Sequence, residues 1–519
     1  MKNKIAKIVT TLAVVIGVGF SGLATVEAGE DNYTYTYDYW GDVQESPDVY
    51  SVARVFTYKD LGMDSNITNA ESLFVYKDRV YVCDTGNNRI VVLRRSGTDD
   101  LVYEDEITAI KGTDVTALSE PSDIAILETL EADEQGNAIT KEYMFICDRG
   151  NSRIVKVDMD LNYILQFDKP VDTAITEDSA FKPDKIVVDT AGRVYCSASG
   201  INKGLVKYET DGAFSGFIGA TRVAYNFTDY IWKKLASQEQ RAKMESFVPT
   251  EYDNVYMDRE GFIYACAGGM DEEDLRSGTV DAVRKLNMLG TDILVRNGAY
   301  YEGEFPVYGD LYWGGGGGVT GPSYFKDVTV LDNDIYVCLD QNRGRLFGYD
   351  DQGRMVYAFG GTGNMEGYFR KPVSIEHMDN DLLVLDQLDC SITMFIPTEY
   401  GSLIYQAMDQ FDHGDYDEAQ ASWEQVKMLN GNYSLAYIGI GRSLLRKEEY
   451  KEAMPYFEAK YDDENYSRAF QQYRKLWIRE HIITIIVIIL ALFLVPMAIA
   501  RVYQIKEEID NADIFKLRR

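Results

Sequence analysis

The side chains that most often carry catalysis are scarce in this chain. It has only three histidines, His377, His413 and His481, and only His377 lies in the strand-rich part. This excludes a zinc site with several histidine ligands in that part. The sequence also lacks a Gly-x-Ser-x-Gly nucleophile elbow and a glycine-rich phosphate loop ending in Gly-Lys-Ser/Thr. We therefore identify no catalytic, metal or cofactor residue.

The chain has many more acidic than basic residues. Asp and Glu number 83 against 52 Lys and Arg, which makes the formal net charge −31. No nucleic acid is expected as a partner, because phosphate binding needs clustered Lys and Arg. The local group Asp332-Asn333-Asp334 lacks the other ligands of a calcium loop and is interpreted as a turn. Calcium is expected only if the chain is an enzyme.

The elements that would position a site fall into two blocks. The first three quarters of the 519 residues are rich in Tyr, Val, Ile, Gly and Asp, whereas the last quarter is typical of helix. Such segregation predicts an all-β domain followed by an α-helical one, rather than a doubly wound sheet. The glycine run 314–318 is interpreted as a flexible connection, with a mobile loop over the β domain as the rival interpretation.

Two apolar segments predict where the chain lies. Basic residues precede the apolar run 8–20 and small residues end at Ala28, which is typical of a secretory signal peptide over residues 1–28. A retained membrane anchor is the rival interpretation. The run 482–500 contains Thr484 as its one polar residue. At about 1.5 Å per residue it is long enough to span a hydrocarbon core of about 30 Å.

Both interpretations of the N-terminus give the same topology. If the signal is cleaved, residues 29–481 lie outside; if it is retained, the chain crosses twice and the same residues are still outside. We therefore predict a single-pass protein of the cell membrane, with its N-terminal ectodomain outside and the short tail 501–519 in the cytoplasm.

A strand–turn–strand unit recurs along residues 49–399. The segment from Val80 to Ile90 is repeated from Met144 to Ile154, and weaker copies contain Cys196, Cys266, Cys338 and Leu385. Six such units at this spacing predict radial repetition in a six-bladed β-propeller.

The two strongest copies resemble a known family. Asp84-Thr85-Gly86-Asn87-Asn88-Arg89-Ile90 and Asp148-Arg149-Gly150-Asn151-Ser152-Arg153-Ile154 are similar to the core of the NHL repeat, which builds six-bladed propellers. Residues 221–250 depart from the pattern and are predicted to be a helical insertion. In such propellers the repeated Asp, Asn and Arg brace neighbouring strands. The resemblance therefore implies a structural role for six residues: Asp84, Asn87, Arg89, Asp148, Asn151 and Arg153.

The six cysteines are predicted to be free thiols. Cys83, Cys147, Cys266 and Cys338 occupy equivalent positions in different copies. Equivalent positions in different blades are expected to exceed the Cα separation of about 7 Å that a disulfide allows.

A second repeat, with a period of 34 residues, occupies residues 400–463. Tyr416, Ala419 and Trp423 recur as Tyr450, Ala453 and Phe457, and Ala407 recurs as Gly441. The spacing resembles the tetratricopeptide repeat and predicts a short pair of helical hairpins, followed by a juxtamembrane helix over 464–481. Peptide recognition and a spacer role both remain open for this segment.

The Tyr-rich N-terminal segment, residues 29–48, alternates like a strand between Tyr33 and Trp40. Packing on the β domain is the favoured interpretation, and stacking on a sugar is the alternative.

Together these features predict a multidomain, membrane-anchored binding or scaffold protein. Its partners would be envelope or transporter proteins, or a carbohydrate, and an accessory role for a membrane transporter is the more specific hypothesis. The alternative is an extracellular metal-dependent lactonase, hydrolase or lyase with its site in the propeller channel.

Overall fold

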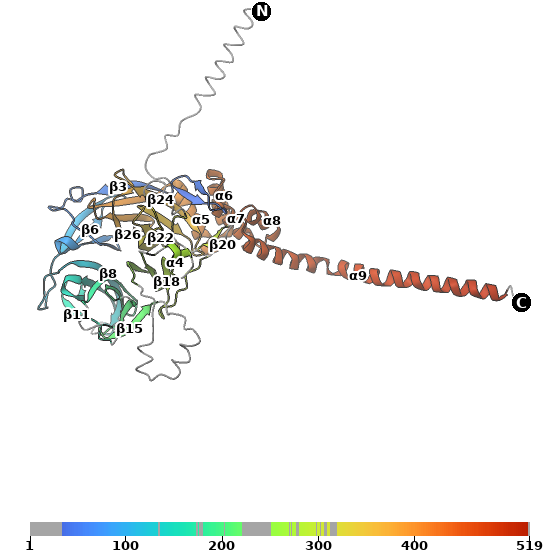
Figure 1. Ribbon diagram of the computed structural model, residues 1–519, viewed down its shortest axis with the longest axis horizontal. Coiled ribbons are helices and arrows are strands. Elements are labelled where there is room, and N and C mark those ends of the chain that lie inside the picture. The colour runs from blue at the N-terminus through green and yellow to red at the C-terminus, as the bar shows by residue number, and fades with distance from the viewer. Residues whose placement is uncertain are drawn as a thin grey trace, which may run out of the picture. The chain divides into compact units, whose positions relative to one another are not determined.

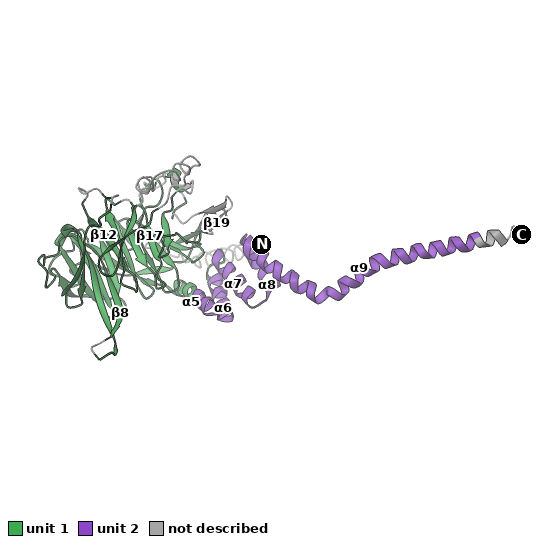
Figure 2. Ribbon diagram, turned by 90° about the horizontal axis from the view of Figure 1, so that it is seen from below, with its two compact units in different colours: residues 1–405, 429–433 green, residues 406–428, 434–519 purple. Residues whose placement is uncertain are grey.

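The structure is a computed structural model. It describes residues 34–516, apart from 133–134, 173–174, 176–179, 202, 221–250, 269, 271, 277–279, 297, 301–302, 306–308 and 312–318. The predicted signal peptide (1–28), the predicted insertion (221–250) and the glycine run (314–318) lie outside the described residues. The chain divides into two compact units, which Figure 2 colours separately. Unit 1 extends to residue 405 and includes 429–433; unit 2 contains 406–428 and the chain from 434 onward.

Unit 1 is a β-propeller, in which successive antiparallel sheets are built by consecutive stretches of chain (Figure 1). Five apolar clusters lie between consecutive sheets, so the sheets bury residues on both faces. The first blade consists of β4 (Ser72–Tyr76), β5 (Arg79–Asp84), β6 (Arg89–Arg95) and β7 (Leu101–Ile107). The second consists of β8 (Pro121–Ala132), β9 (Ala138–Asp148), β10 (Arg153–Asp158) and β11 (Tyr163–Phe167). The third consists of β12 (Lys182–Val188), β13 (Val194–Ser199), β14 (Gly204–Tyr208) and β15 (Phe214–Gly219).

The remaining full blades lie near the end of unit 1. Their strands are β21 (Phe325–Val330), β22 (Tyr336–Asp340), β23 (Arg345–Tyr349) and β24 (Met355–Thr362), and then β26 (Pro372–Met378), β27 (Asp381–Asp386), β28 (Ser391–Pro397) and β3 (Tyr50–Phe56). The short β25 (Tyr368–Phe369) pairs in parallel with β24.

The prediction of a six-bladed propeller is wrong, because the described chain forms five blades of four or more strands. The fourth copy forms a three-stranded sheet from β16 (Asn254–Met257), β17 (Ile263–Cys266) and β18 (Val283–Leu286). After β18 the chain pairs with itself, as β19 (Gly298–Tyr300) and β20 (Gly303–Phe305), and so does not add a fourth strand. The small sheet lies between β12 and β21, both of which β16 contacts.

The ring is closed by strands from opposite ends of unit 1. β3 pairs antiparallel with β28, with Phe56 opposite Ile392 and Tyr50 opposite Pro397. The last blade therefore contains strands from both ends of unit 1, which holds the first strand of the ring to the last.

The Tyr-rich segment packs on the propeller, as the favoured interpretation predicts. It forms β1 (Tyr35–Tyr37) and β2 (Val43–Glu45), and β1 adds to the outer edge of β24. Both tyrosines of β1 are buried, and Tyr37 Oη donates a hydrogen bond of 2.6 Å to Asp310.

All six cysteines are free, as predicted, and five of them are buried. Cys147 and Cys196 belong to one inter-blade core cluster, and Cys266 and Cys338 to another, because each pair comes from consecutive sheets that face the same space.

Unit 2 is helical. The end of α5 (Glu399–His413), α6 (Tyr416–Leu429), α7 (Ser434–Arg446) and α8 (Tyr450–Glu458) form two helical hairpins, and α9 (Asp463–Lys516) follows. Four of the repeat positions are buried, Ala419 and Trp423 in the first hairpin and Ala453 and Phe457 in the second, whereas Tyr416 and Tyr450 are half-buried.

The predicted juxtamembrane and membrane segments form one continuous helix, α9. Among the described residues, α9 is the one helix with the length and apolar composition to cross a membrane, and its apolar stretch has a mean hydropathy of 3.2. The large apolar side chains of this stretch are exposed, which a core helix of a soluble protein would not show.

Candidate functional site

The Asp, Asn and Arg of the first repeat converge on one buried carboxylate. Asp84 ends β5, and the 3-10 turn η1 (Thr85–Asn87) then returns the chain to β6. Asp84 Oδ2 accepts hydrogen bonds from Asn87 at 2.8 Å and from Arg89 Nε at 2.7 Å, while Oδ1 accepts one from the Thr68 backbone N–H at 2.7 Å.

The second repeat has the same geometry. After Asp148 the turn η2 (Arg149–Asn151) leads into β10, and Asp148 accepts from Asn151 and from Arg153 Nε, both at 2.8 Å. Asp148 Oδ1 also accepts from the Ser119 backbone N–H at 2.8 Å, which connects the turn to the chain before β8. The structural role of these six residues stays a prediction; none of them lines the cavity described next.

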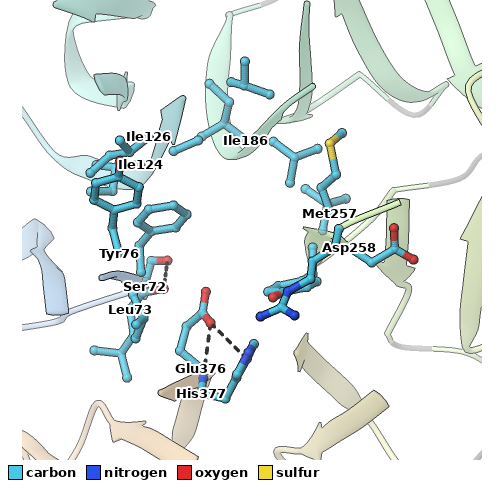
Figure 3. Close-up of a pocket in the computed structure, with 18 of the residues that line it drawn as sticks. Ser72, Leu73, Tyr76, Ile124, Ile126, Ile186, Met257, Asp258, Glu376 and His377 are labelled. Atoms are coloured by element: carbon cyan, nitrogen blue, oxygen red, sulfur yellow. Dashed lines mark hydrogen bonds and ion pairs between the residues drawn. The ribbon is translucent and has the colours of Figure 1, made fainter. Parts of the chain in front are cut away.

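A cavity of about 910 Å³ lies where the innermost strands meet. Figure 3 shows its lining side chains around an open space, with apolar groups from β8 and β12 opposite Glu376 and His377 of β26. The partly exposed apolar side chains of the lining include Phe74, Ile126, Val188 and Met257, whereas others that border the cavity, such as Ile124 and Ile186, are buried between the blades. The cavity can therefore enclose a drug-sized ligand with an apolar body.

Each innermost strand has a polar residue near its start. Two of these residues, Asp123 and Asp327, accept hydrogen bonds from neighbouring innermost strands. Asp123 of β8 accepts from Ser72 Oγ of β4 at 2.6 Å and from the Ile186 N–H of β12 at 2.9 Å. Asp327 of β21 accepts from Ser374 Oγ at 2.8 Å and from the Ile375 N–H at 2.7 Å, both of β26.

Lys185 contributes a buried positive charge beside these carboxylates. Its ammonium donates to the Glu71 carbonyl at 2.9 Å. Burial alone would lower the pKa of Lys185, but attraction to Asp123 and Asp327 raises it. Burial raises the pKa of Asp123, and it raises that of Asp327 to about 6, against the opposing pull of Lys185 and the Ser374 and Ile375 hydrogen bonds.

The raised pKa of Asp327 predicts a pH-dependent stability. The folded state holds the proton of the Asp327 carboxyl more tightly than the unfolded state does. The resulting contribution to the free energy of unfolding is therefore present below about pH 4 and is lost as the pH rises to about 6. Between pH 4 and pH 7, the free energy of unfolding of Asp327→Asn is expected to rise by up to about 3 kcal/mol relative to that of the parent protein, because the variant has no carboxyl at this position to lose its proton. Urea unfolding of both proteins across this range measures the difference, and parallel pH profiles would contradict the prediction.

Glu376 and His377 form a second polar group on the cavity wall. Thr329 Oγ1 lies 2.7 Å from His377 Nδ1 and 3.4 Å from Glu376 Oε2, and the His377 backbone N–H donates to the same Oε2 at 3.3 Å. Burial raises the pKa of Glu376 well above its usual range and lowers that of His377. A carboxylic acid beside a neutral imidazole can bind a polar ligand or exchange a proton with it.

Charged residues also line the cavity. Nine carboxylates and three Lys or Arg residues belong to the lining. All three cations are already paired: Lys77 with Glu128 at 3.0 Å, Arg95 with Asp379 at 3.2 Å, and Arg259 with Asp332. No three His, Cys, Asp or Glu side chains within the described part of the chain are placed to hold a metal ion together.

Sequence reasoning missed the cavity residues, although a signal for them exists. Pro121-Ser122-Asp123-Ile124, Pro183-Asp184-Lys185-Ile186 and Pro372-Val373-Ser374-Ile375 repeat a proline two residues before a polar position and an isoleucine after it. Each proline precedes a register shift in the innermost strand. Reading this second repeat beside the NHL-like one would have identified the channel.

Comparison with known proteins finds low similarity to solved structures. No family model and no curated protein matches this chain. Virginiamycin B lyase from Staphylococcus aureus is 10% identical over 67% of this chain and 99% of its own, with a TM-score of 0.34. BamB from Moraxella catarrhalis is 11% identical over 67% and 99%, with a TM-score of 0.31. The PQQ-bound aldose sugar dehydrogenase from Streptomyces coelicolor is 9% identical over 68% and 100%, with a TM-score of 0.33.

Proposed function

We propose that the chain is a membrane-anchored, extracytoplasmic binding protein whose ligand site is the propeller channel. The observation that carries the proposal is the cavity of about 910 Å³, which combines an apolar wall with the buried polar groups Glu376 and His377. A largely apolar pocket with a few convergent polar groups is the usual form of a ligand site.

The finer organisation belongs to the same proposal. Residues 1–28 act as the signal peptide, the blades derive from NHL-like repeats over 49–399, and the hairpins of 400–463 act as a tetratricopeptide-like contact surface. The segment 482–500 is the membrane span, and the tail 501–519 lies in the cytoplasm. Partners are then envelope or transporter proteins, or a carbohydrate held in the channel.

Removing the apolar half of α9 tests the anchor. A chain ending at Glu480 keeps the buried start of the helix around Ala469 but loses the exposed apolar stretch. We expect the full chain to stay in the membrane pellet after alkaline carbonate washing and the shortened chain to be soluble, because about 20 apolar residues hold a helix in a bilayer. A full chain that is released by carbonate would contradict the anchor.

A photo-crosslinker inside the cavity tests the binding role. Benzoylphenylalanine in place of Met257, which lines the cavity, is compared with the same group in place of Leu130, which is 74% exposed and does not line it. The chain is expressed in its own host, irradiated in intact cells and purified from the membrane. Adducts specific to position 257 support the proposal; identical or absent adducts at both positions contradict it.

A second candidate function is a lyase or hydrolase with its site in the same channel. The Glu376–His377 pair favours it, because the opposite pKa shifts of the two groups suit general acid–base chemistry. Turnover of candidate lactones and esters by the purified full chain, with and without added divalent metal, tests this function. Turnover that His377→Gln abolishes would favour the enzyme over the binding protein.

A further inference from the structure

Glu376 is a buried carboxyl whose hydrogen bonding is incomplete. It is 8% exposed and lies on β26, between the Asp327 side of the channel and the His377 ring. Both of its hydrogen bonds, from Thr329 and from the His377 backbone, are long and reach the same oxygen, Oε2. No described residue hydrogen-bonds to Oε1, and Figure 3 shows the carboxyl turned toward the open space.

The protein provides no cation for this carboxyl within its described residues. The one titratable base near it is His377, whose Nδ1 is 3.9 Å from Oε2 and whose pKa is lowered by burial. Lys77, Arg95 and Arg259 are held by other carboxylates of the lining, and Lys185 donates to the Glu71 carbonyl. Burial raises the pKa of Glu376, and a positively charged group entering the cavity would offset that cost and stabilise the ionised carboxylate.

The rest of the cavity suits the body of such a ligand. Ile126, which is partly exposed, faces Glu376 across the open space, and Met257, also partly exposed, lies to one side (Figure 3). The nine carboxylates against three Lys or Arg in the lining give the cavity a negative field. A cavity with walls of low dielectric and one sign of charge concentrates ligands of the opposite sign.

We propose that the channel binds an organic cation, with an ammonium group on the Glu376 carboxylate and an apolar body against Ile126 of β8 and Met257 of β16. The inference rests on the proposed binding function and adds to it the chemical class of the ligand. It also gives Glu376 the role of a recognition residue, with no part in bond breaking.

Three probes of similar size and different charge test the proposal on the full chain in a neutral detergent. They are benzylamine, which is protonated at neutral pH, benzyl alcohol and benzoate; saturation-transfer titrations are corrected with protein-free micelles. We expect benzylamine to bind at least about tenfold more tightly than benzyl alcohol, and benzoate to bind least, since a hydrogen bond to a charged partner is the larger contribution. Equal binding of benzylamine and benzyl alcohol, or no binding of any probe, overturns the proposal.

Glu376→Gln is the matched variant, and Glu366→Gln, at an exposed glutamate outside the cavity lining, is its control. We expect E376Q to remove the preference for benzylamine while it leaves benzyl alcohol binding intact, and E366Q to change neither. A preference that persists in folded E376Q overturns the role of Glu376. If E376Q fails to fold, the comparison of the three probes on the parent protein decides. Equal binding of the neutral and cationic probes would contradict only the preference for a cation. If no probe binds and the photo-crosslinker at position 257 forms no specific adduct, the proposed binding function is contradicted as well.

Discussion

Asp148→Ala is expected to destabilise the propeller by roughly 3–5 kcal/mol, because it leaves the Arg153 guanidinium buried without its carboxylate. Arg153 is only 3% exposed, and its Nε donates to Asp148 at 2.8 Å. The substitution also removes the acceptor of Asn151 and of the Ser119 backbone N–H, so three donors lose a partner at once. Urea unfolding of the full chain in detergent, followed by hydrogen exchange in β9 and β10, measures the loss.

Asp100→Ala is the matched control for this prediction. It also separates an aspartate from an arginine, since Asp100 accepts from Arg54 at 2.7 Å, but both side chains of that pair are about 40% exposed. An exposed ion pair contributes about 1 kcal/mol or less. Equal losses for the two variants would show that Asp148 is no more than a surface acid, and the implied role of the repeat would be wrong.

Phe457→Ala is expected to cost roughly 3–5 kcal/mol in unit 2, the range found when a buried phenylalanine is truncated. Phe457 of α8 is fully buried, and its ring packs over Gly441 of α7, where an added Cβ would lie 2.6 Å from the ring. The flat ring therefore occupies the space that this glycine leaves open. Hydrogen exchange in α7 and α8 should rise sharply while exchange in the blades is unchanged, because the loss is confined to one unit.

Phe470→Ala provides the same change of side chain at an exposed position of α9, where Phe470 is 44% exposed. It should alter protection little. A weak effect of Phe457→Ala, comparable with that of Phe470→Ala, would mean that the 34-residue repeat does not form a packed core.

Local patterns in the sequence predicted the parts of the fold that depend on local interactions. The Asp–Asn–Arg turns, the buried positions at Ala419 and Trp423, and the packing of the Tyr-rich strand all depend on residues whose periodicity is visible within one repeat. The ring was predicted but not the strand that completes its last blade, because nothing in residues 50–56 indicates that their partner is strand 391–397. The three-stranded sheet was missed for a similar reason: a strand-like segment in the sequence does not reveal whether its neighbour pairs with it or with itself.

The candidate site was harder to predict than the fold. Glu376 and Lys185 lie in ordinary-looking strands, and they acquire their chemistry only when several innermost strands meet around one axis. A histidine count or a motif search weighs residues that are close in sequence. In this cavity, however, the residues that meet are far apart in sequence. Asp327 accepts a hydrogen bond from the backbone N–H of Ile375, 48 residues later, and Glu376 is the next residue.

The pairing of β3 with β28 sets an order on how the molecule can mature. Tyr50–Phe56 emerges early from the ribosome, yet the residues opposite it are made more than three hundred positions later. Until then the first strand has no partner, and the sheet it will complete exposes an edge that can recruit a neighbouring chain. Unit 1 acquires its final shape only after almost all of its residues have been synthesised, and long-range pairing of this kind is slow. Its biogenesis therefore depends on keeping the opening segment unaggregated while synthesis finishes.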